Sequence, residues 1–250
     1  MAHPAILIVG AKGRMGLAIR DAAGRLGFPI AGAVDAGDDP LPLLPRADVV
    51  IDFSHHTATA QVIEMVAKAG KALVIGTTGH PAAERARLAV EAARIPCVWA
   101  GNFSVGVNLL NHLVREAARA LDGSFDIEVL EMHHRMKTDA PSGTAEALLR
   151  ILEESRGLSA ADERHGRSGI TGARTSKEIG VHSLRGGDVV GDHTVVFAAP
   201  GERVELTHKA SSREIFALGA LRAADWLVGR TPGLYDMSHV LGIGASGRQP

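Results

Sequence analysis

Residues 5–20 read AILIVGAKGRMGLAIR, which joins a short apolar run to a glycine-rich turn and then to an amphipathic helical pattern. Gly10, Gly13 and Gly16 have the spacing that allows a tight turn, close approach of the backbone to a pyrophosphate, and close packing of helix on strand. The N-terminus of the following helix would add unpaired N–H groups and partial positive charge. Such glycines can also serve packing alone, so the surrounding elements decide whether this is a dinucleotide site.

The rest of the first hundred residues alternates strand and helix patterns. The strand patterns are 30–35, 47–54, 72–78 and 97–102, and the helical patterns are 57–70 and 81–94. The strands are apolar on both faces, which is typical of a parallel sheet covered by helices. This order predicts an α/β fold whose N-terminal part is a Rossmann-type doubly wound parallel sheet, and it favours dinucleotide binding by the glycine loop.

The pattern changes in the second hundred residues. The predicted elements there are a helix at 105–121, strand-rich text at 125–134 and 179–210, and a helix at 144–155. We expect a second α+β domain with a mixed or antiparallel sheet. The polar residues 156–175 are expected to form an extended surface loop. The last predicted helix, 213–229, carries Ile215, Leu218 and Leu221 at helical spacing and is expected to pack back on the first domain.

Composition excludes several classes of function. The 27 Lys and Arg residues nearly balance the 28 Asp and Glu residues, so no global field recruits nucleic acid or a membrane surface, and small partners are expected. No apolar run approaches the roughly twenty residues of a membrane span, and no secretory signal pattern is visible. Cys97 is the single cysteine, lies in an apolar run and is expected to be buried and inert, which suits a cytoplasmic location.

Asp35 lies at the end of the second strand pattern, about twenty residues beyond the last glycine of the loop. A carboxylate at this place can bind the adenosine ribose hydroxyls. Ala36 and Gly37 follow it and offer no cation for a 2′-phosphate, so NADH is favoured as the cofactor. NADPH stays possible, because Arg14 or Lys12 could reach a phosphate from the loop.

Two further loops follow strand patterns of the first domain. GTTG at 76–79 follows the fourth strand pattern and AGNFSVG at 100–106 follows the fifth. Ligands of open parallel sheets bind outside the carboxyl ends of the strands, so both loops are expected to face the cofactor. The alternative is that they are ordinary turns between strand and helix.

The stretch EMHHRMKTDAPSGTAEALL at 131–149 gathers the titratable groups of the second domain. Side chains alternate along a strand, so Glu131 and His133 should share one face while His134 points to the other. Lys137 follows on a turn, where a partly buried lysine can donate a proton near neutrality. Ser142 or the residue after it caps a helix whose N–H groups form an anion site. Together these groups suggest a substrate with a carboxylate and a reaction that needs a proton.

Other interpretations of the histidines and acids carry less weight. A metal site through Glu131 and His133 is disfavoured, because no third ligand lies at a recognisable spacing, and no metal is expected. Four further histidines are interpreted as ordinary surface imidazoles. They are His55, His56, His165 and His193.

The motifs GAKGRMG, GTTG, NFSVGVN, EMHHRMKTDAPSGTA and GERVELTHKASSR closely resemble those of the 4-hydroxy-tetrahydrodipicolinate reductase family of bacterial lysine and diaminopimelate biosynthesis. The resemblance runs essentially from end to end of the chain. It implies reduction of a small cyclic imine dicarboxylate by NAD(P)H with loss of water. It also implies a dinucleotide-binding domain at 1–104 completed by 213–250, a substrate-binding and oligomerisation domain at 105–212, and a homotetramer.

The resemblance also implies roles for individual residues. His133 would be a proton donor or acceptor near the reacting centre, Lys137 the proton donor, and His134, Gly143 and Thr144 the groups that hold the substrate carboxylates. The residues that would line the cofactor are Gly10, Ala11, Lys12, Gly13, Arg14, Met15, Asp35, Gly76, Thr77, Thr78, Ala100, Gly101, Asn102 and Phe103. Some relatives carry an arginine where this chain has Ala36, which weakens the case for NADPH.

Two other classes of function stay open at this point. A different dehydrogenase on the same plan would act on an alcohol or aldehyde and not on the cyclic imine. A protein that senses NADH without turnover would bind the cofactor equally well without Lys137. The spacing of the two histidines and Lys137 argues against both, because a sensor needs no proton donor.

Overall fold

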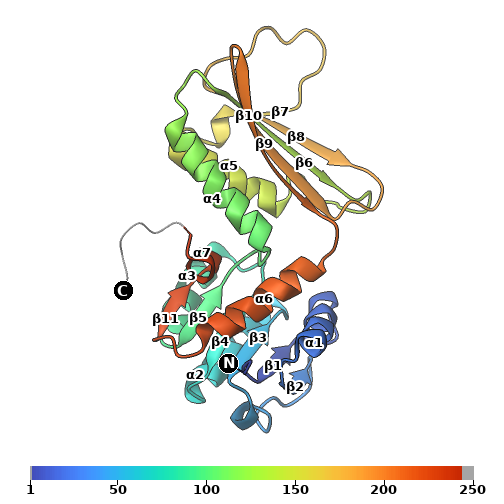
Figure 1. Cartoon of the computed structure of the whole chain (residues 1–250), viewed down its shortest axis with the longest axis vertical. Helices are drawn as coiled ribbons and strands as arrows, with labels where there is room; N and C mark the ends of the chain where they lie inside the picture. The colour runs from blue at the N-terminus through green and yellow to red at the C-terminus, as the bar shows by residue number, and fades with distance from the viewer. Residues whose placement is uncertain (1, 244–250) are drawn as a thin grey trace. The chain divides into compact units, whose positions relative to one another are not determined.

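The computed structural model describes residues 2–243 of the 250-residue chain. The chain divides into two compact units, each with its own sheet (Figure 1). The first unit is Met1–Val105 together with Arg213–Pro250, and the second unit is Gly106–Ser212. The sequence predicted a division after residues 104 and 212.

The first unit is built on a six-stranded parallel sheet in the order β11-β5-β4-β3-β1-β2. Its strands are β1 Ile6–Val9, β2 Ile30–Val34, β3 Val49–Asp52, β4 Ala72–Ile75, β5 Pro96–Trp99 and β11 Gly233–Tyr235. Its helices are α1 Arg14–Leu26, α2 Thr59–Lys68, α3 Ala82–Ala92, α6 Glu214–Leu227 and α7 Met237–Leu241, with short 3-10 turns at Leu44–Arg46 and His56–Ala58. This is the predicted doubly wound parallel sheet.

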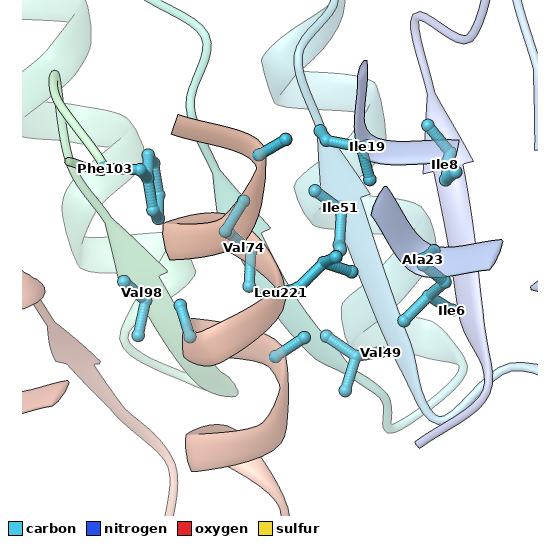
Figure 2. Close-up of a cluster of buried hydrophobic side chains, with 14 of the residues drawn as sticks. Ile6, Ile8, Ile19, Ala23, Val49, Ile51, Val74, Val98, Phe103 and Leu221 are labelled. Atoms are coloured by element: carbon cyan, nitrogen blue, oxygen red, sulfur yellow. The ribbon is translucent and has the colours of Figure 1, made fainter. Parts of the chain in front are cut away.

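The two faces of this sheet bury separate apolar cores. One core joins the strands to α1, α6 and α7, and Figure 2 shows Ile19 of α1 and Leu221 of α6 over Ile51 and Val74 of the sheet. The other core joins the strands to α2 and α3. Burial of apolar side chains on both faces is what holds a parallel sheet between helix layers, and it leaves the strand ends for ligands.

The buried face of α6 differs from the predicted one. Leu218 is 39% exposed and Ile215 is only half-buried, whereas Ala217, Gly219 and Leu221 are buried together with further alanines. Small residues are buried here because the helix passes very close to the chain at Phe103. A Cβ on Gly219 would lie 1.8 Å from the carbonyl oxygen of Phe103. A larger side chain at position 219 would hold the helix too far from the chain at Phe103.

The second unit is built on a five-stranded mixed sheet in the order β10-β9-β6-β8-β7. Its strands are β6 Asp126–His133, β7 Glu163–His165, β8 Ile179–Arg185, β9 Gly191–Ala199 and β10 Glu202–Ala210. The helices α4 Val105–Ala120 and α5 Gly143–Arg156 pack on one face of the sheet (Figure 1). The central strand β6 runs parallel to β8 and antiparallel to β9, as expected for a mixed sheet.

The segment 156–175 is not the extended loop that was predicted. It contains a 3-10 turn at Ala160–Asp162 and the edge strand β7, which pairs parallel with β8. Later in the segment Arg174 donates hydrogen bonds to Asp126 at 2.8 Å and to the carbonyl of Ile127 at 2.8 Å. The strand could not be predicted from this polar segment, because the three residues of β7 are too few to show an alternating pattern.

Two short elements after α6 were also not predicted. β11 pairs parallel with β5, and α7 is capped by Asp236, which accepts hydrogen bonds from two backbone N–H groups.

Cys97 on β5 is fully buried, as predicted, and burial raises the pKa of its thiol. No helix within residues 2–243 combines the length and the apolar character needed to cross a bilayer.

Candidate active site

One face of β6 is apolar in its first half and polar at its end, where it carries Glu131 and His133. Ile127 and Val129 on this face are buried in the apolar core, and the alternation of the strand then brings Glu131 and His133 to the same side. The register places His193 of β9 beside Glu131 and Arg185 of β8 beside His133. The sequence predicted the shared face of the first pair but not the two neighbours.

Glu131 is a buried carboxylate with three strong partners. Its side chain has no exposed surface, and Arg185 donates to it from Nη1 at 2.9 Å and from Nη2 at 2.8 Å. The Nδ1 of His133 lies 2.5 Å from Oε2. Burial acts to raise the pKa of Glu131, but the hydrogen bonds from Arg185, Ser183 and His133 together hold that pKa below its usual value. The group is therefore ionised at neutral pH.

His133 is held as a neutral imidazole of defined tautomer. Burial lowers the pKa of His133, and Lys137 and Arg185 act in the same direction, while Glu131 partly opposes them. An ionised carboxylate can only accept, so Nδ1 carries the proton and Nε2 presents its lone pair. A Cβ on Gly191 would lie 2.9 Å from Nε2, so the glycine at the start of β9 leaves that nitrogen room.

His193 was interpreted from sequence as a surface imidazole, and this interpretation is wrong. The residue is 3% exposed and its ring centroid lies 5.2 Å from that of His133. Its Nε2 shares a 3.0 Å hydrogen bond with Oγ of Ser142, the N-cap of α5. Burial, and after it the nearby His133, lowers the pKa of His193 to about 4. The signal that could have found it is the strand register, which a single sequence does not reveal.

Ser142 confirms the predicted helix start at the end of the motif. Its Oγ accepts a hydrogen bond from the N–H of Ala145 at 3.2 Å, and α5 begins at Gly143. Gly143 is exposed and Thr144 is half-buried, so both lie at the helix end where partial positive charge is concentrated. This end of a 14-residue helix is suited to an anion.

Lys137 lies on the turn that follows β6 and is mostly covered. Its side chain is 18% exposed, and its Nζ donates to both carboxylate oxygens of Asp139, at 2.8 and 2.7 Å. The N–H of Lys137 is bonded to the carbonyl of half-buried His134 at 3.1 Å. Arg185 donates to the carbonyl of Asp139 at 2.7 Å, so this arginine contacts both Glu131 and the lysine turn.

The first unit has a cavity of about 730 Å³ at the carboxyl ends of β1, β2 and β3. Of the predicted cofactor residues, Gly10, Gly13 and Asp35 line it. The remaining lining comes from the loop at 36–41 and from residues after β3, for which no role was predicted. These further residues are Phe53, Ser54, His55, Thr57, Ala58, Gln61, Val62 and Met65, with Val9 and Val34 from the strands.

The glycine loop fits the pyrophosphate of a dinucleotide. Gly10 has a φ of +82°, and a Cβ there would lie 2.5 Å from the carbonyl oxygen of Phe53. A Cβ on Gly16 would lie 2.3 Å from the carbonyl oxygen of Gly10. The N-cap of α1 is Gly13, which offers no side chain to the helix N–H groups, and the first turn holds no acid. That helix end is therefore suited to a phosphate.

Asp35 lies at the end of β2 and lines the cavity. Its carboxylate accepts hydrogen bonds from the backbone N–H groups of Lys12, at 2.7 Å, and Ala36, at 2.9 Å. These bonds lower the pKa of Asp35. An ionised acceptor at this edge fits the ribose hydroxyls of a dinucleotide.

Among the other predicted cofactor residues, Thr77 and Phe103 are buried, and Gly76 lies close against a neighbouring ring. Thr77 is buried, and its hydroxyl lies 3.0 Å from a carboxylate oxygen of Asp52. Phe103 is buried in the apolar core, as Figure 2 shows, so only its backbone can face a ligand. A Cβ on Gly76 would lie 2.2 Å from the ring of Phe53. Lys12, Arg14, Thr78 and Gly101 are exposed, Met15 and Asn102 are half-buried, and Ala11 and Ala100 are buried.

Asp52, for which no role was predicted, organises the end of β3. Its side chain is fully buried, and it accepts a 2.5 Å hydrogen bond from the hydroxyl of Ser54 in addition to the one from Thr77. Burial outweighs these bonds and raises its pKa.

His56, interpreted as a surface imidazole, is half-buried, and its Nδ1 has no hydrogen-bond partner among residues 2–243. Within the same range no cluster of three or more potential ligands could hold a metal ion.

A doubly wound sheet with a glycine-lined cavity, in one chain with a buried histidine–carboxylate site, is typical of a two-domain oxidoreductase that uses a dinucleotide. Two family models match the chain, "Dihydrodipicolinate reductase, N-terminus" over residues 4–103 and "Dihydrodipicolinate reductase, C-terminus" over residues 106–241. The chain belongs to the dihydrodipicolinate reductase family.

Individual relatives agree with the family models. A 4-hydroxy-tetrahydrodipicolinate reductase of Akkermansia muciniphila is 55% identical over 240 residues, which are 95% of this chain and 98% of the relative. One of Anaeromyxobacter sp. (strain Fw109-5) is 51% identical, over 94% of this chain and 88% of the relative. The structure of a dihydrodipicolinate reductase with bound dipicolinate, from Paenisporosarcina sp. TG-14, has a TM-score of 0.74 at 23% identity and covers 94% of this chain and 97% of its own. That likeness shows the same fold.

Proposed function

We propose that this protein reduces 4-hydroxy-tetrahydrodipicolinate to tetrahydrodipicolinate with NAD(P)H and with loss of water, in lysine and diaminopimelate biosynthesis. The relatives that share half of its residues carry this name. The observation that carries the proposal is the junction of β6 and α5 in the second unit. There a fixed neutral imidazole, a covered lysine and a helix N-terminus lie on one short stretch of chain.

The substrate carries two carboxylates, and we assign their binding to the start of α5 and to the motif before it. Gly143 and Thr144 offer the helix end, and His134 adds a polar side chain from the end of β6. Binding of a carboxylate at a helix N-terminus is favoured by the N–H groups and the partial charge there. The ammonium of Lys137, now paired with Asp139, supplies a full positive charge on the same stretch.

The 4-hydroxyl and one ring proton leave together as water, which gives a conjugated imine. A hydride then adds at C4, and the electron-rich framework beside the imine nitrogen takes up one proton. The reduced nicotinamide supplies the hydride when it is bound. We assign the proton to Lys137, because His133 is neutral and its only N–H is committed to Glu131. His133 would then accept a hydrogen bond at Nε2. Through that bond it would either orient the substrate or guide the proton that is transferred to the substrate.

We propose NADH rather than NADPH as the preferred cofactor, and the acidic lining of the cavity supports this preference. Asp35, Asp38 and Asp39 all line the region at the end of β2, and Ala36 offers no cation there. A 2′-phosphate would meet three carboxylates, whereas a free 2′-hydroxyl can donate to one of them. Lys12 and Arg14 are exposed at the glycine loop and leave NADPH possible.

A homotetramer in the cytoplasm completes the proposal. β10 is a nine-residue strand at the edge of the second sheet, and its first half is exposed on both faces. Long exposed edge strands favour pairing with another chain, which supports assembly through this unit. The buried single thiol at Cys97 suits a reducing compartment.

The decisive experiment supplies the unstable hydroxy-imine from an enzymatic source and follows the absorbance of NADH, then of NADPH. Turnover that depends on the hydroxy-imine, with kcat/KM higher for NADH, is the expected result. Oxidation of NADH by an alcohol, aldehyde or amino-acid couple, with none by the hydroxy-imine, would assign the protein to another dehydrogenase class. Tight NADH binding without turnover of any dicarboxylate would make it a sensor.

A further inference from the structure

We propose that Glu131 and Arg185 are positioning residues for the reaction assigned above: together they fix the tautomer of His133 and hold the Lys137 turn beside it. The inference rests on the proposed function for its kinetic part. Its structural part concerns only residues of the second unit and can be tested without substrate.

The position of Glu131 makes a purely structural role a poor explanation. It lies two residues beyond Val129 on the core face of β6, and its side chain has no exposed surface. Transfer of an ion pair from water to such a place is costly, and well-packed apolar residues of similar size are often as stable or more stable. The strand already uses apolar residues at the two preceding core positions. A carboxylate at the third position is therefore retained for what it does to His133.

Glu131 acts on His133 through geometry as well as charge. The 2.5 Å contact joins Oε2 to Nδ1, so the proton of the neutral ring stays on Nδ1 and the lone pair stays on Nε2. Without this acceptor the neutral ring could carry its proton on either nitrogen. An imidazole with the proton on Nε2 could no longer accept a hydrogen bond from the reacting partner at that atom.

Arg185 fixes the carboxylate and the lysine turn at the same time. Its Nη1 donates to Glu131 and to the carbonyl of Leu184, and its Nη2 donates to the other oxygen of Glu131 and to the carbonyl of Asp139. Asp139 holds the ammonium of Lys137 through its side chain. One planar guanidinium thus connects the two groups to which proton handling is assigned, and a lysine could not make all four bonds.

Four charged or titratable groups face the ring of His133. Glu131 on β6 favours its protonation, while Lys137 on the turn and Arg185 on β8 disfavour it, and His193 on β9 lies edge-on at 5.2 Å between ring centroids. Removal of the carboxylate would leave only groups that oppose a positive charge. The titration midpoint of His133 should then move to lower pH, by about one unit or more.

The test uses two variants, because a single change can leave a buried charge unpaired. Glu131→Gln removes the charge and keeps the shape. The double variant Glu131→Leu with Arg185→Met removes both charges and should fold, since apolar replacement of a buried pair is tolerated. Glu163→Gln is the matched control: Glu163 accepts from His165 two residues later at 2.7 Å, but that histidine is about half exposed and lies on the edge strand β7.

The first readout is nitrogen NMR of 15N-histidine-labelled protein over a pH series, with His133→Gln to assign the signal. We expect the Nδ1–H tautomer in the wild-type chain, a mixture or the Nε2–H form in the double variant, and a lower midpoint in Glu131→Gln. Glu163→Gln should change only the signal of His165. An unchanged tautomer and midpoint for His133 in both Glu131 variants would overturn the positioning role.

The second readout is turnover. We expect kcat to fall at least tenfold in Glu131→Gln and further in the double variant, toward the 10²- to 10⁴-fold typical of a positioned acid–base group, with NADH affinity unchanged. The acid limb of the pH profile should move to lower pH together with the NMR midpoint. Wild-type kcat in a folded double variant would refute the positioning role and leave the proposed function standing. Absence of turnover in the wild-type chain, with the tautomer still dependent on Glu131, would refute the proposed function instead.

Discussion

Ser142 and His193 are 51 residues apart in sequence and share a hydrogen bond of 3.0 Å between Oγ and Nε2. Because Oγ accepts from the N–H of Ala145, the hydroxyl proton is free to point at the imidazole. The bond ties the first turn of α5 to strand β9, next to His133. It therefore fixes the helix N-terminus, the assigned carboxylate site, relative to the imidazole of the proposed proton-handling group.

His193 should make stability depend on pH in a defined window. Its pKa of about 4 in the folded chain lies below the ordinary value of 6.5, so the unfolded chain takes up the proton first as pH falls. The free energy of unfolding should decrease between pH 6.5 and 4, by about 3 kcal/mol from this group. Above pH 6.5 the contribution is constant.

Urea unfolding at pH 7 and pH 4 measures this effect. The glutamine in His193→Gln cannot titrate. The free energy of unfolding of this variant should therefore fall less between pH 7 and pH 4 than that of the wild-type chain, by most of the about 3 kcal/mol assigned to His193. His165→Gln serves as the control, because His165 is half exposed and should leave the pH dependence unchanged. Equal acid sensitivity of His193→Gln and the wild-type chain would contradict the buried neutral state of this ring.

Lys137→Ala should depress kcat strongly and leave NADH binding intact. The lysine belongs to the second unit, whereas the glycine loop and Asp35 belong to the first. Loss of a positioned proton donor reduces turnover by about 10²- to 10⁴-fold. Steady-state turnover measures kcat, and a fluorescence titration measures the dissociation constant of NADH. Lys68→Ala, at an exposed lysine of α2, is the control. A comparable loss of NADH affinity in Lys137→Ala would contradict the assignment.

Local signals in the sequence were sufficient for the parallel sheet of the first unit and for the shared face of Glu131 and His133. The close approaches at Gly10 and Gly16 and the position of Asp35 after β2 could be predicted, because they depend on neighbours within one strand–turn–helix unit. Glu131 and His133 could be placed on one face because strand alternation is local. Arg185 and His193 could not, because only the register of β6 with β8 and β9 brings them to Glu131. A half-buried arginine and a buried imidazole look, in a single sequence, like surface residues.

The helix α6 shows the same limit in the core. Ile215, Leu218 and Leu221 predicted the buried face, but only Leu221 is fully buried, because the close approach at Phe103 selects the side of the helix that carries alanine and glycine. A hydrophobic pattern reports which residues are apolar, not how near the partner backbone comes. The residues after β3 that line the cavity were not predicted, since residues 53–65 contain no glycine-rich turn that would mark a ligand loop.

Asp35→Ala should weaken NADH binding about ten- to hundredfold, the range for loss of hydrogen bonds to a charged group. NADPH binding should weaken less, because a 2′-phosphate gains from removal of the negative charge. The ratio of the two dissociation constants, measured by fluorescence titration, should therefore move toward NADPH. Asp21→Ala, at an exposed position on α1, should change neither constant. An unchanged ratio in Asp35→Ala would show that the carboxylate does not face the ribose.

Gly191→Ala tests whether Nε2 of His133 needs the space that this glycine leaves. An added Cβ would lie 2.9 Å from Nε2, which is closer than such atoms approach, and the ring cannot turn aside because Nδ1 is held by Glu131. We expect kcat to fall about tenfold or more, since misplacement of a catalytic group by an ångström is enough for such a loss. NADH affinity should be unchanged.

Gly123→Ala is the matched control for that change. Gly123 lies in the same unit, and a Cβ there meets nothing within 4 Å, so turnover should stay at the wild-type level. Urea unfolding of both variants separates a local effect at the ring from general damage to the sheet. Should Gly191→Ala retain full kcat while remaining as stable as the control, Nε2 of His133 would not be the atom that meets the substrate.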